Sequence, residues 1–290
     1  MRSASRPSGV IRVGVSGWRY PRWRGDFYPV GLPQRRELEY IGDRFPTVEL
    51  NGSFYSLQRP ESYRRWREAV PSDFVFAVKG SRYITHMRRL RDVGQALSNF
   101  FASGVLALGP QLGPFLWQFP ERLRFDADVL SAFLDALPRT TGEALRMARH
   151  HDERLSGRAW LEIDEDRPIR HAVEPRSRTF DAPASLHRLH QRGASLVVAD
   201  TAGRWPRFDA ITGDFMYVRL HGARALYRSG YTPTELREWA HLVTSWADGS
   251  GAQDRRPRDV YVYFDNDARG HAPHDAAALA ALIATATATG

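Results

Sequence analysis

The sequence contains no cysteine and a single lysine, Lys79, among its 41 lysine and arginine residues. The absence of cysteine excludes disulfides, zinc–thiolate sites, iron–sulfur clusters and a cysteine nucleophile. No apolar run is long enough to cross a bilayer, so no membrane partner is expected. The N-terminal stretch MRSASRPSGV lacks the apolar segment of a signal peptide. We therefore expect a disordered lead over residues 1–9 and a cytoplasmic protein.

Asparagine is also scarce, with only Asn51, Asn99 and Asn266. The formal net charge of +8 would suit a polyanion such as nucleic acid. Abundant arginine and alanine beside scarce lysine and asparagine are, however, what G+C-rich coding produces. The charge is therefore weak evidence for nucleic-acid binding, and the rare residue types become more informative. A lysine differs from an arginine because its compact ammonium can lose a proton.

Short runs that are apolar at nearly every position recur along the chain, which is typical of strands buried on both faces of a parallel sheet. The predicted strands are 11–18, 47–55, 74–82, 113–120, 171–177, 195–203, 215–222 and 260–267. The predicted helices between them are 35–44, 60–69, 91–108, 126–137, 183–192, 233–247 and 274–285. Pro60, Pro183 and Pro233 stand where a helix should begin.

Eight strands alternating with helices predict an α/β fold, a (β/α)8 TIM barrel, as a single domain over residues 10–284. A doubly wound open sheet is the alternative, but the first strand, VGVSGWRY, is not followed by a glycine-rich phosphate turn. The charged stretch 139–169 is expected to be an insertion between strands four and five. Residues 285–290 are expected to fray.

Barrel enzymes place their active sites at the carboxyl ends of the strands. Polar side chains stand at these ends on every predicted strand, and burying them is costly unless they pair or meet a ligand. Individually they could form an ion-pair lattice, but as a set they favour a ligand site. The predicted substrate-binding residues are Trp18, Tyr20, Asn51, Tyr55, Arg82, His86, Gln118, Arg176, Asp200, Arg219, Asp265 and Asn266.

Lysine, arginine and histidine side chains at these ends together outnumber the carboxylates, which favours a small anionic ligand, phosphorylated or carboxylated. The predicted catalytic residues are Glu49, Lys79, Glu174 and His221. Among them Lys79 and His221, with Arg176 and Arg219, would bind the anion, and a glutamate would transfer a proton.

No cofactor is predicted. A divalent metal held by Glu49, Glu174, Asp200 and His221, as in a hydrolase, isomerase or nuclease-like barrel, is the second hypothesis. Non-enzymatic nucleic-acid binding is the third.

Six blocks of the chain match, in order, a family that is already known. They are GVSGWRYPRWRGDFYP, VELNGSFYSL, FVFAVKGSRYITHMRRL, GPFLWQFP, FMYVRLHG and YVYFDNDARGHAP. The chain resembles the DUF72, or YecE-like, family over nearly its whole length, and the resemblance implies a TIM-type barrel. Ser177 and Phe180 stand where that family usually has a histidine and a tryptophan. The resemblance implies no reaction, because the family's biochemical function is not established.

Overall fold

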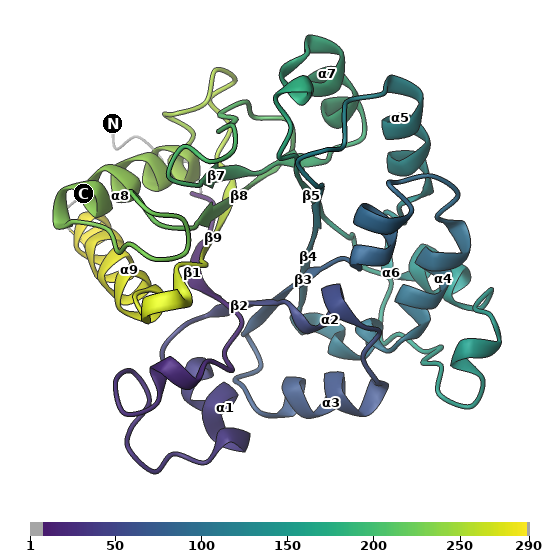
Figure 1. The fold of residues 1–290 in the computed structure, drawn as a ribbon, viewed down its shortest axis with the longest axis horizontal. Helices are drawn as coiled ribbons and strands as arrows, with labels where there is room; N and C mark the ends of the chain where they lie inside the picture. The colour runs from purple at the N-terminus through teal and green to yellow at the C-terminus, as the bar shows by residue number, and fades with distance from the viewer. Residues whose placement is uncertain (1–7, 289–290) are drawn as a thin grey trace, which may run out of the picture.

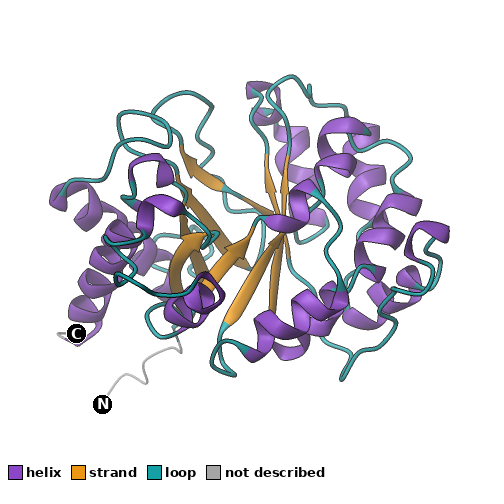
Figure 2. Cartoon of the chain, turned by 60° about the horizontal axis from the view of Figure 1, so that its bottom comes forward, coloured by secondary structure: helices purple, strands orange, loops and turns teal. Residues whose placement is uncertain are grey.

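The computed structural model describes residues 8–288, which form one parallel sheet surrounded by helices (Figures 1 and 2). Its strand order is β6-β5-β4-β3-β2-β1-β9-β8-β7. The strands are β1 (Ile11–Ser16), β2 (Thr47–Leu50), β3 (Val75–Lys79), β4 (Leu112–Gln118), β5 (His171–Glu174), β6 (Ser195–Leu196), β7 (Val198–Asp200), β8 (Phe215–Leu220) and β9 (Asp259–Phe264).

The two ends of this sheet meet at a single residue. Only Val197 separates β6 from β7, and its backbone N–H donates to the carbonyl oxygen of Val173 at 2.9 Å. Because β6 pairs with β5 and β7 pairs with β8, the two short strands act as one interrupted strand that closes the ring. The expected (β/α)8 TIM-barrel fold is confirmed.

Helices form the outer layer, visible in Figure 1 as a ring around the strands. They are α1 (Glu37–Gly42), α2 (Gly52–Tyr55), α3 (Pro60–Glu68), α4 (Gly94–Ala102), α5 (Ala127–Ala136), α6 (Thr141–Ala148), α7 (Pro183–Gln191), α8 (Pro233–Asp248) and α9 (Ala272–Ala288). Short 3-10 turns span Pro21–Trp23, Gln34–Arg36, Val105–Gln111, Glu153–Leu155, Arg178–Asp181 and Asp267–Arg269, and Tyr83–Met87 forms a π turn.

Several predicted boundaries were wrong. The second strand ends at Leu50 and is followed by the helical turn α2, and β3 ends at Lys79 before the π turn. The predicted helix 91–108 is broken by Gly104, whose φ of +112° is left-handed and ends α4.

The expected insertion contains a helix that periodicity did not reveal. Helix α6 begins at a Thr140 cap and packs against α4. At the ends of the chain, Gly9 donates to Ala247, and α9 continues to Ala288. The rest of the expected lead and of the expected frayed tail lies outside the described residues.

The apolar residues divide into two clusters, one on each face of the sheet. The larger packs the outer strand faces against the helices. The smaller consists of residues from the strands and from Val197, including Ala77, Leu116 and Ala172, and fills the barrel. Since side chains alternate between faces along a strand, the next inward positions are Lys79, Gln118 and Glu174. The polar site therefore lies one layer above an apolar core.

Gly14 lies where β1 passes close to β2. A Cβ added there would lie 2.1 Å from the carbonyl oxygen of Thr47, a backbone atom that cannot rotate away. We expect Gly14→Ala to lower the free energy of unfolding by about 1–3 kcal/mol, measured by urea denaturation. Gly94→Ala is the matched control, because no atom lies within 4 Å of its added Cβ. The control should be neutral or stabilising by up to about 1 kcal/mol, and equal losses in both variants would contradict the prediction.

In the part of the chain that the structure describes, no helix combines the length and apolar character needed to cross a membrane.

Candidate functional site

A cavity of about 570 Å³ opens at the carboxyl ends of the strands. Its lining residues are Tyr20, Asn51, Phe54, Tyr55, Lys79, Arg82, His86, Gln118, Arg176, Tyr227 and Asp265. Nine of them belong to the site residues predicted from the sequence, and Phe54 and Tyr227 do not. The barrel mouth is therefore a partly open chamber lined by side chains from β3, β4, α2 and several loops.

Beneath this cavity lies Arg219, whose side chain is fully buried. Its Nε and Nη2 donate to the two carboxylate oxygens of Glu49 at 2.9 and 2.7 Å. Its Nη1 donates to Glu174 and its Nη2 to Asp265, both at 2.8 Å. Arg219 was expected to bind an anion directly, but these carboxylates surround its guanidinium and it does not line the cavity. It is instead the centre of the ion-pair lattice that the sequence left as the alternative.

Two of the carboxylates around Arg219, those of Glu174 and Asp265, have lowered pKa values. Burial alone would raise the pKa of Glu174, but Arg219 and Arg176 together lower it to about 2. The same balance holds the pKa of Asp265 well below its usual value, with Arg219 as the main favourable charge. Glu49 also accepts from the hydroxyl groups of Tyr217 and Ser16. Both carboxylate oxygens of Glu49 and of Glu174 thus accept from protein groups, whereas Asp265 accepts through Oδ2 and also lines the cavity.

The same contacts bear on the hypothesis of a metal. The inward carboxylates of Glu49, Glu174 and Asp265 already share one cation, the guanidinium of Arg219. Across residues 8–288, no group of three or more His, Asp or Glu side chains could hold a metal ion.

Lys79 extends from the end of β3 into the cavity, above the Arg219 lattice. Its Nζ lies 4.5 Å from the ring centroid of Phe54, and within residues 8–288 it makes no hydrogen bond or ion pair. Burial and the nearby charge of Arg219 lower its pKa to about 8, against the opposing effect of the carboxylates. Lys79 is therefore a cation that can lose its proton near neutral pH.

Three further polar side chains face the cavity, and two of them have no protein partner in the described structure. The exposed guanidinium of Arg82 and the buried amide of Gln118 make no side-chain hydrogen bonds. His86 contacts the hydroxyl of Thr85 through Nδ1 at 2.8 Å. Burial and the charge of Lys79 lower the pKa of His86 to about 4, so its ring is neutral at pH 7. The mouth thus presents two cations and further hydrogen-bonding groups to a ligand.

Arg176 is held more firmly than these groups. Its Nε donates to Glu174 at 3.1 Å and its Nη2 to the hydroxyl of Tyr227 at 3.3 Å. Its guanidinium also stacks on Trp205 at 3.6 Å from the ring centroid. Arg176 is a fixed wall of the cavity and adds positive charge to it.

The remaining predicted residues lie away from the cavity. His221 is buried beside Arg219, and burial and that charge lower its pKa. Asp200 accepts from the Tyr231 hydroxyl, and the Asn266 amide donates to Asp275 at 2.8 Å, toward α9. The side chain of Trp18 packs against α3 rather than facing Lys79.

Sequence reasoning missed Phe54 and Tyr227 for identifiable reasons. Phe54 was placed in an extended strand, whereas α2 turns its ring beneath Lys79. Tyr227 lies in the loop after β8, where no pattern marks a site residue. The Asn51-Gly52 pair, two residues before Phe54, was the one available sign of a turn there.

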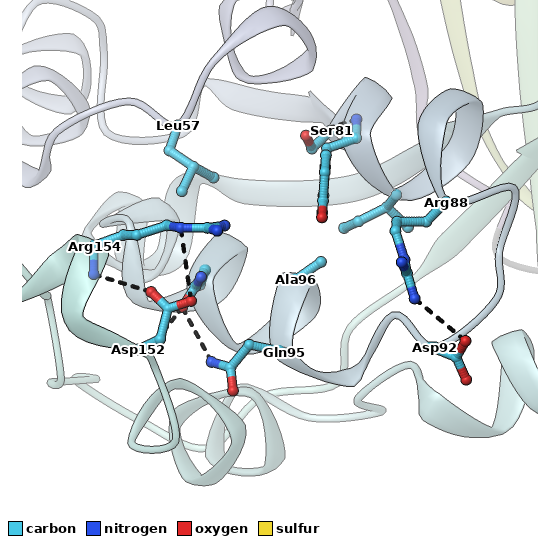
Figure 3. A pocket seen from close by; sticks show the side chains of 11 residues that line it. Leu57, Ser81, Arg88, Asp92, Gln95, Ala96, Asp152 and Arg154 are labelled. Atoms are coloured by element: carbon cyan, nitrogen blue, oxygen red, sulfur yellow. Dashed lines mark hydrogen bonds and ion pairs between the residues drawn. The ribbon is translucent and has the colours of Figure 1, made fainter.

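A second pocket, of about 330 Å³, lies outside the barrel beside α4 (Figure 3). Its charged groups pair with one another: Arg88 donates to Asp92 at 3.2 Å, and Arg154 lies 4.0 Å from Asp152. The amide of Gln95 donates to the backbone of His150. The cations of this pocket are thus neutralised locally, unlike Lys79 at the barrel mouth.

Comparison with known proteins places the chain in a family. The model of the family described as protein of unknown function DUF72 matches residues 12–289. The UPF0759 protein YecE of Escherichia coli K12 is 28% identical over 198 residues, which cover 66% of this chain and 60% of YecE. The UPF0759 protein YunF of Bacillus subtilis is 24% identical over 286 residues, covering 91% of each chain.

Solved structures show the same fold. A DUF72 family protein (TM1631) from Thermotoga maritima aligns with a TM-score of 0.74 and 24% identity, over 95% of this chain and 99% of its own. Another (EF0366), from Enterococcus faecalis, aligns with a TM-score of 0.69 and 17% identity, over 95% and 96%. The chain therefore belongs to DUF72, a family of barrel proteins of unknown function.

Proposed function

We propose that this protein is an enzyme that binds a small anionic substrate, phosphorylated or carboxylated, in the cavity at the barrel mouth. The observation that carries the proposal is the position of Lys79 and Arg82, two cations that face one cavity and have no partner in the described structure. A cation kept out of ion pairs in a protein rich in arginine–carboxylate pairs is available to a ligand. The amide of Gln118 adds a hydrogen-bond donor beside them.

Lys79 is the residue that we assign to proton transfer. With a pKa of about 8, it can hold the anion as an ammonium and exchange a proton at neutral pH. Glu174 suits this role poorly, because a carboxylate with a pKa of about 2 is a weak base. In this assignment the Arg219 lattice supports the site from below, because the guanidinium holds the carboxylates of Glu49, Glu174 and Asp265 in place under Lys79.

Binding of sulfate tests the anion site, because sulfate keeps its charge across the pH range of interest. We expect Lys79→Met to weaken sulfate binding by about tenfold to a hundredfold at pH 7, since a hydrogen bond to a charged group is lost. Isothermal titration calorimetry measures the effect. Arg88→Met is the matched control, because Arg88 pairs with Asp92 in the pocket of Figure 3 and should not affect binding.

The same titration repeated at different pH values tests the state of Lys79. Only the ammonium form attracts an anion, so the affinity of the wild type should fall about tenfold per pH unit above about 8. Lys79→Met should show no such fall. Wild-type affinity in Lys79→Met, or no binding of sulfate, phosphate or simple carboxylates to the wild type, would contradict the proposal.

A further inference from the structure

A smaller cavity of about 280 Å³ adjoins the barrel mouth. The two cavities share Tyr20, Asn51 and Tyr55 in their linings, so these side chains stand between them. The smaller cavity differs in chemistry, because it is lined by Trp18, Leu50 and Trp66. Neither Lys79 nor Arg82 reaches it.

The aromatic wall of this second cavity is formed in advance. Trp18 and Trp66 meet edge to face with their ring centroids 5.6 Å apart, and Trp66 packs in the same way on the buried Tyr63 at 5.2 Å. Trp18 is itself buried. These contacts hold both indole rings in place, so a ligand would not have to order them on binding.

The backbone gives this cavity its remaining shape. Gly17 and Gly52 line it without side chains, and Gly17 has a φ of +84°. A Cβ at Gly17 would lie 2.9 Å from the Tyr20 hydroxyl, so glycine allows Tyr20 to stand between the cavities. The amide of Gln58 donates to the carbonyl oxygens of Gly52 and Ser56 and closes one side.

Tyr55 is the exposed part of the shared wall. The residue is 70% exposed, although a large aromatic side chain gains free energy by burial. It lines both the cationic and the aromatic cavity, and its ring can cover a group that lies between them. Arg19, at the edge of the second cavity, provides a guanidinium that can also stack on a ring.

We propose that the two cavities form one bipartite site for an anion attached to a planar apolar ring, such as an aryl phosphate or an aryl carboxylate. The charged group lies at Lys79 and Arg82, and the ring lies against Trp18, Tyr55 and Trp66. An apolar cavity of about 150 Å³ is enough to hold benzene, so the second cavity has room for one ring. This inference rests on the proposed function, because it assigns the substrate class of the same site.

The test compares two probes that carry the same charged group, methylphosphonate and phenylphosphonate, by calorimetry on the full chain. We expect the wild type to bind phenylphosphonate at least about tenfold more tightly than methylphosphonate. Tyr55→Ala should reduce this preference for phenylphosphonate, the ratio of the two affinities, to about twofold. Tyr83→Ala is the matched control, because this exposed tyrosine lines the pocket of Figure 3 and should leave the ratio unchanged.

Lys79→Met separates this inference from the proposed function. This variant should weaken the binding of both phosphonates by a similar factor, so that the ratio of their two affinities is unchanged. Equal affinities of the two probes in the wild type, or a ratio that Tyr55→Ala leaves unchanged, would overturn the bipartite site while the anion site stands. If neither phosphonate binds, and sulfate does not bind either, both proposals fall.

Discussion

Replacing Arg219 with leucine is expected to lower the free energy of unfolding by about 3–5 kcal/mol at pH 7. The substitution removes the cation that Glu49, Glu174 and Asp265 share at 2.7–2.8 Å, in a layer where Glu49 and Arg219 are fully buried. Glu49 would then be left with hydroxyl donors only, and Glu174 and Asp265 would each lose their nearest charged partner. Breaking a buried ion pair from one side is costly for this reason.

Urea denaturation of the wild type and of Arg219→Leu at pH 7 measures this loss. Arg204→Ala is the matched control, because Arg204 pairs with Glu121 at 3.1 Å on the surface, with side chains 58% and 50% exposed. A surface pair of this kind contributes less than about 1 kcal/mol. An Arg219→Leu protein within about 1 kcal/mol of the wild type would show that the lattice does not hold the barrel mouth together.

The pH dependence of Arg219→Leu gives a second readout. Without Arg219, the largest favourable charge on Glu174 and Asp265 is lost, so burial should raise the folded-state pKa values of these two carboxyl groups above their unfolded values. The variant should therefore be most stable below about pH 4.5, and it should lose stability as the pH rises through the folded pKa values. If the free energy of unfolding of the variant stays below that of the wild type by the same amount from pH 4 to pH 7, this explanation is contradicted.

Acidification should destabilise the wild type through Glu174. The pKa of this carboxyl is lowered from the usual 4.5 to about 2 by Arg219 and Arg176, against the effect of burial. A lowered folded pKa stabilises the protein above the unfolded pKa, and that stability is lost as the pH falls from about 4.5 to about 2. This lowering of the Glu174 pKa corresponds to about 3 kcal/mol in the free energy of unfolding. Glu174→Gln should lack this contribution at pH 7 and approach the wild type near pH 2.

Asp254→Asn is the control for Glu174→Gln. The Arg258 side chain lowers the pKa of Asp254 to about 2 as well, but Asp254 is 44% exposed. Solvent screens such a pair, so its removal should cost less than about 1 kcal/mol at any pH. Chemical denaturation of both variants at pH 7 and near pH 3 measures the contrast. Equal losses in the two variants would mean that burial of Glu174 adds nothing to its ion pairs.

The strands were predictable because both of their faces are buried. Apolar runs such as 74–82 and 215–222 could be recognised as strands without knowing which strands they pair with. Their alternation with helices predicted the barrel. Their ends were less certain, because β2 stops at Leu50 and the chain turns at once into α2. The helix α6 was missed in a charged stretch, although Thr140 and Glu143 have the spacing of a capping box.

The position of the site at the strand ends was predictable from the sequence, but which of its side chains reach the cavity and which lie below it was not. Counting to the end of each strand identified nine residues that line the cavity, among them Lys79, Gln118 and Asp265. The same count could not tell that Arg219 lies one layer below them. Nor could it tell that Asn266 turns toward α9. Neighbouring strands in a barrel are staggered, so equal positions along two strands lie at different heights.

The sequence by itself determined the α/β class of this protein, the alternation that closes a barrel, and the end of the barrel where its polar residues gather. It did so because burial on both strand faces and helix capping are local requirements that leave local patterns. Only the tertiary structure decided which charges pair and which remain free. Arg219 and Lys79 are both basic residues on inward strand positions, yet three carboxylates surround the first while the second faces an open cavity. That difference arises from distances between side chains far apart in the chain, which no local pattern records.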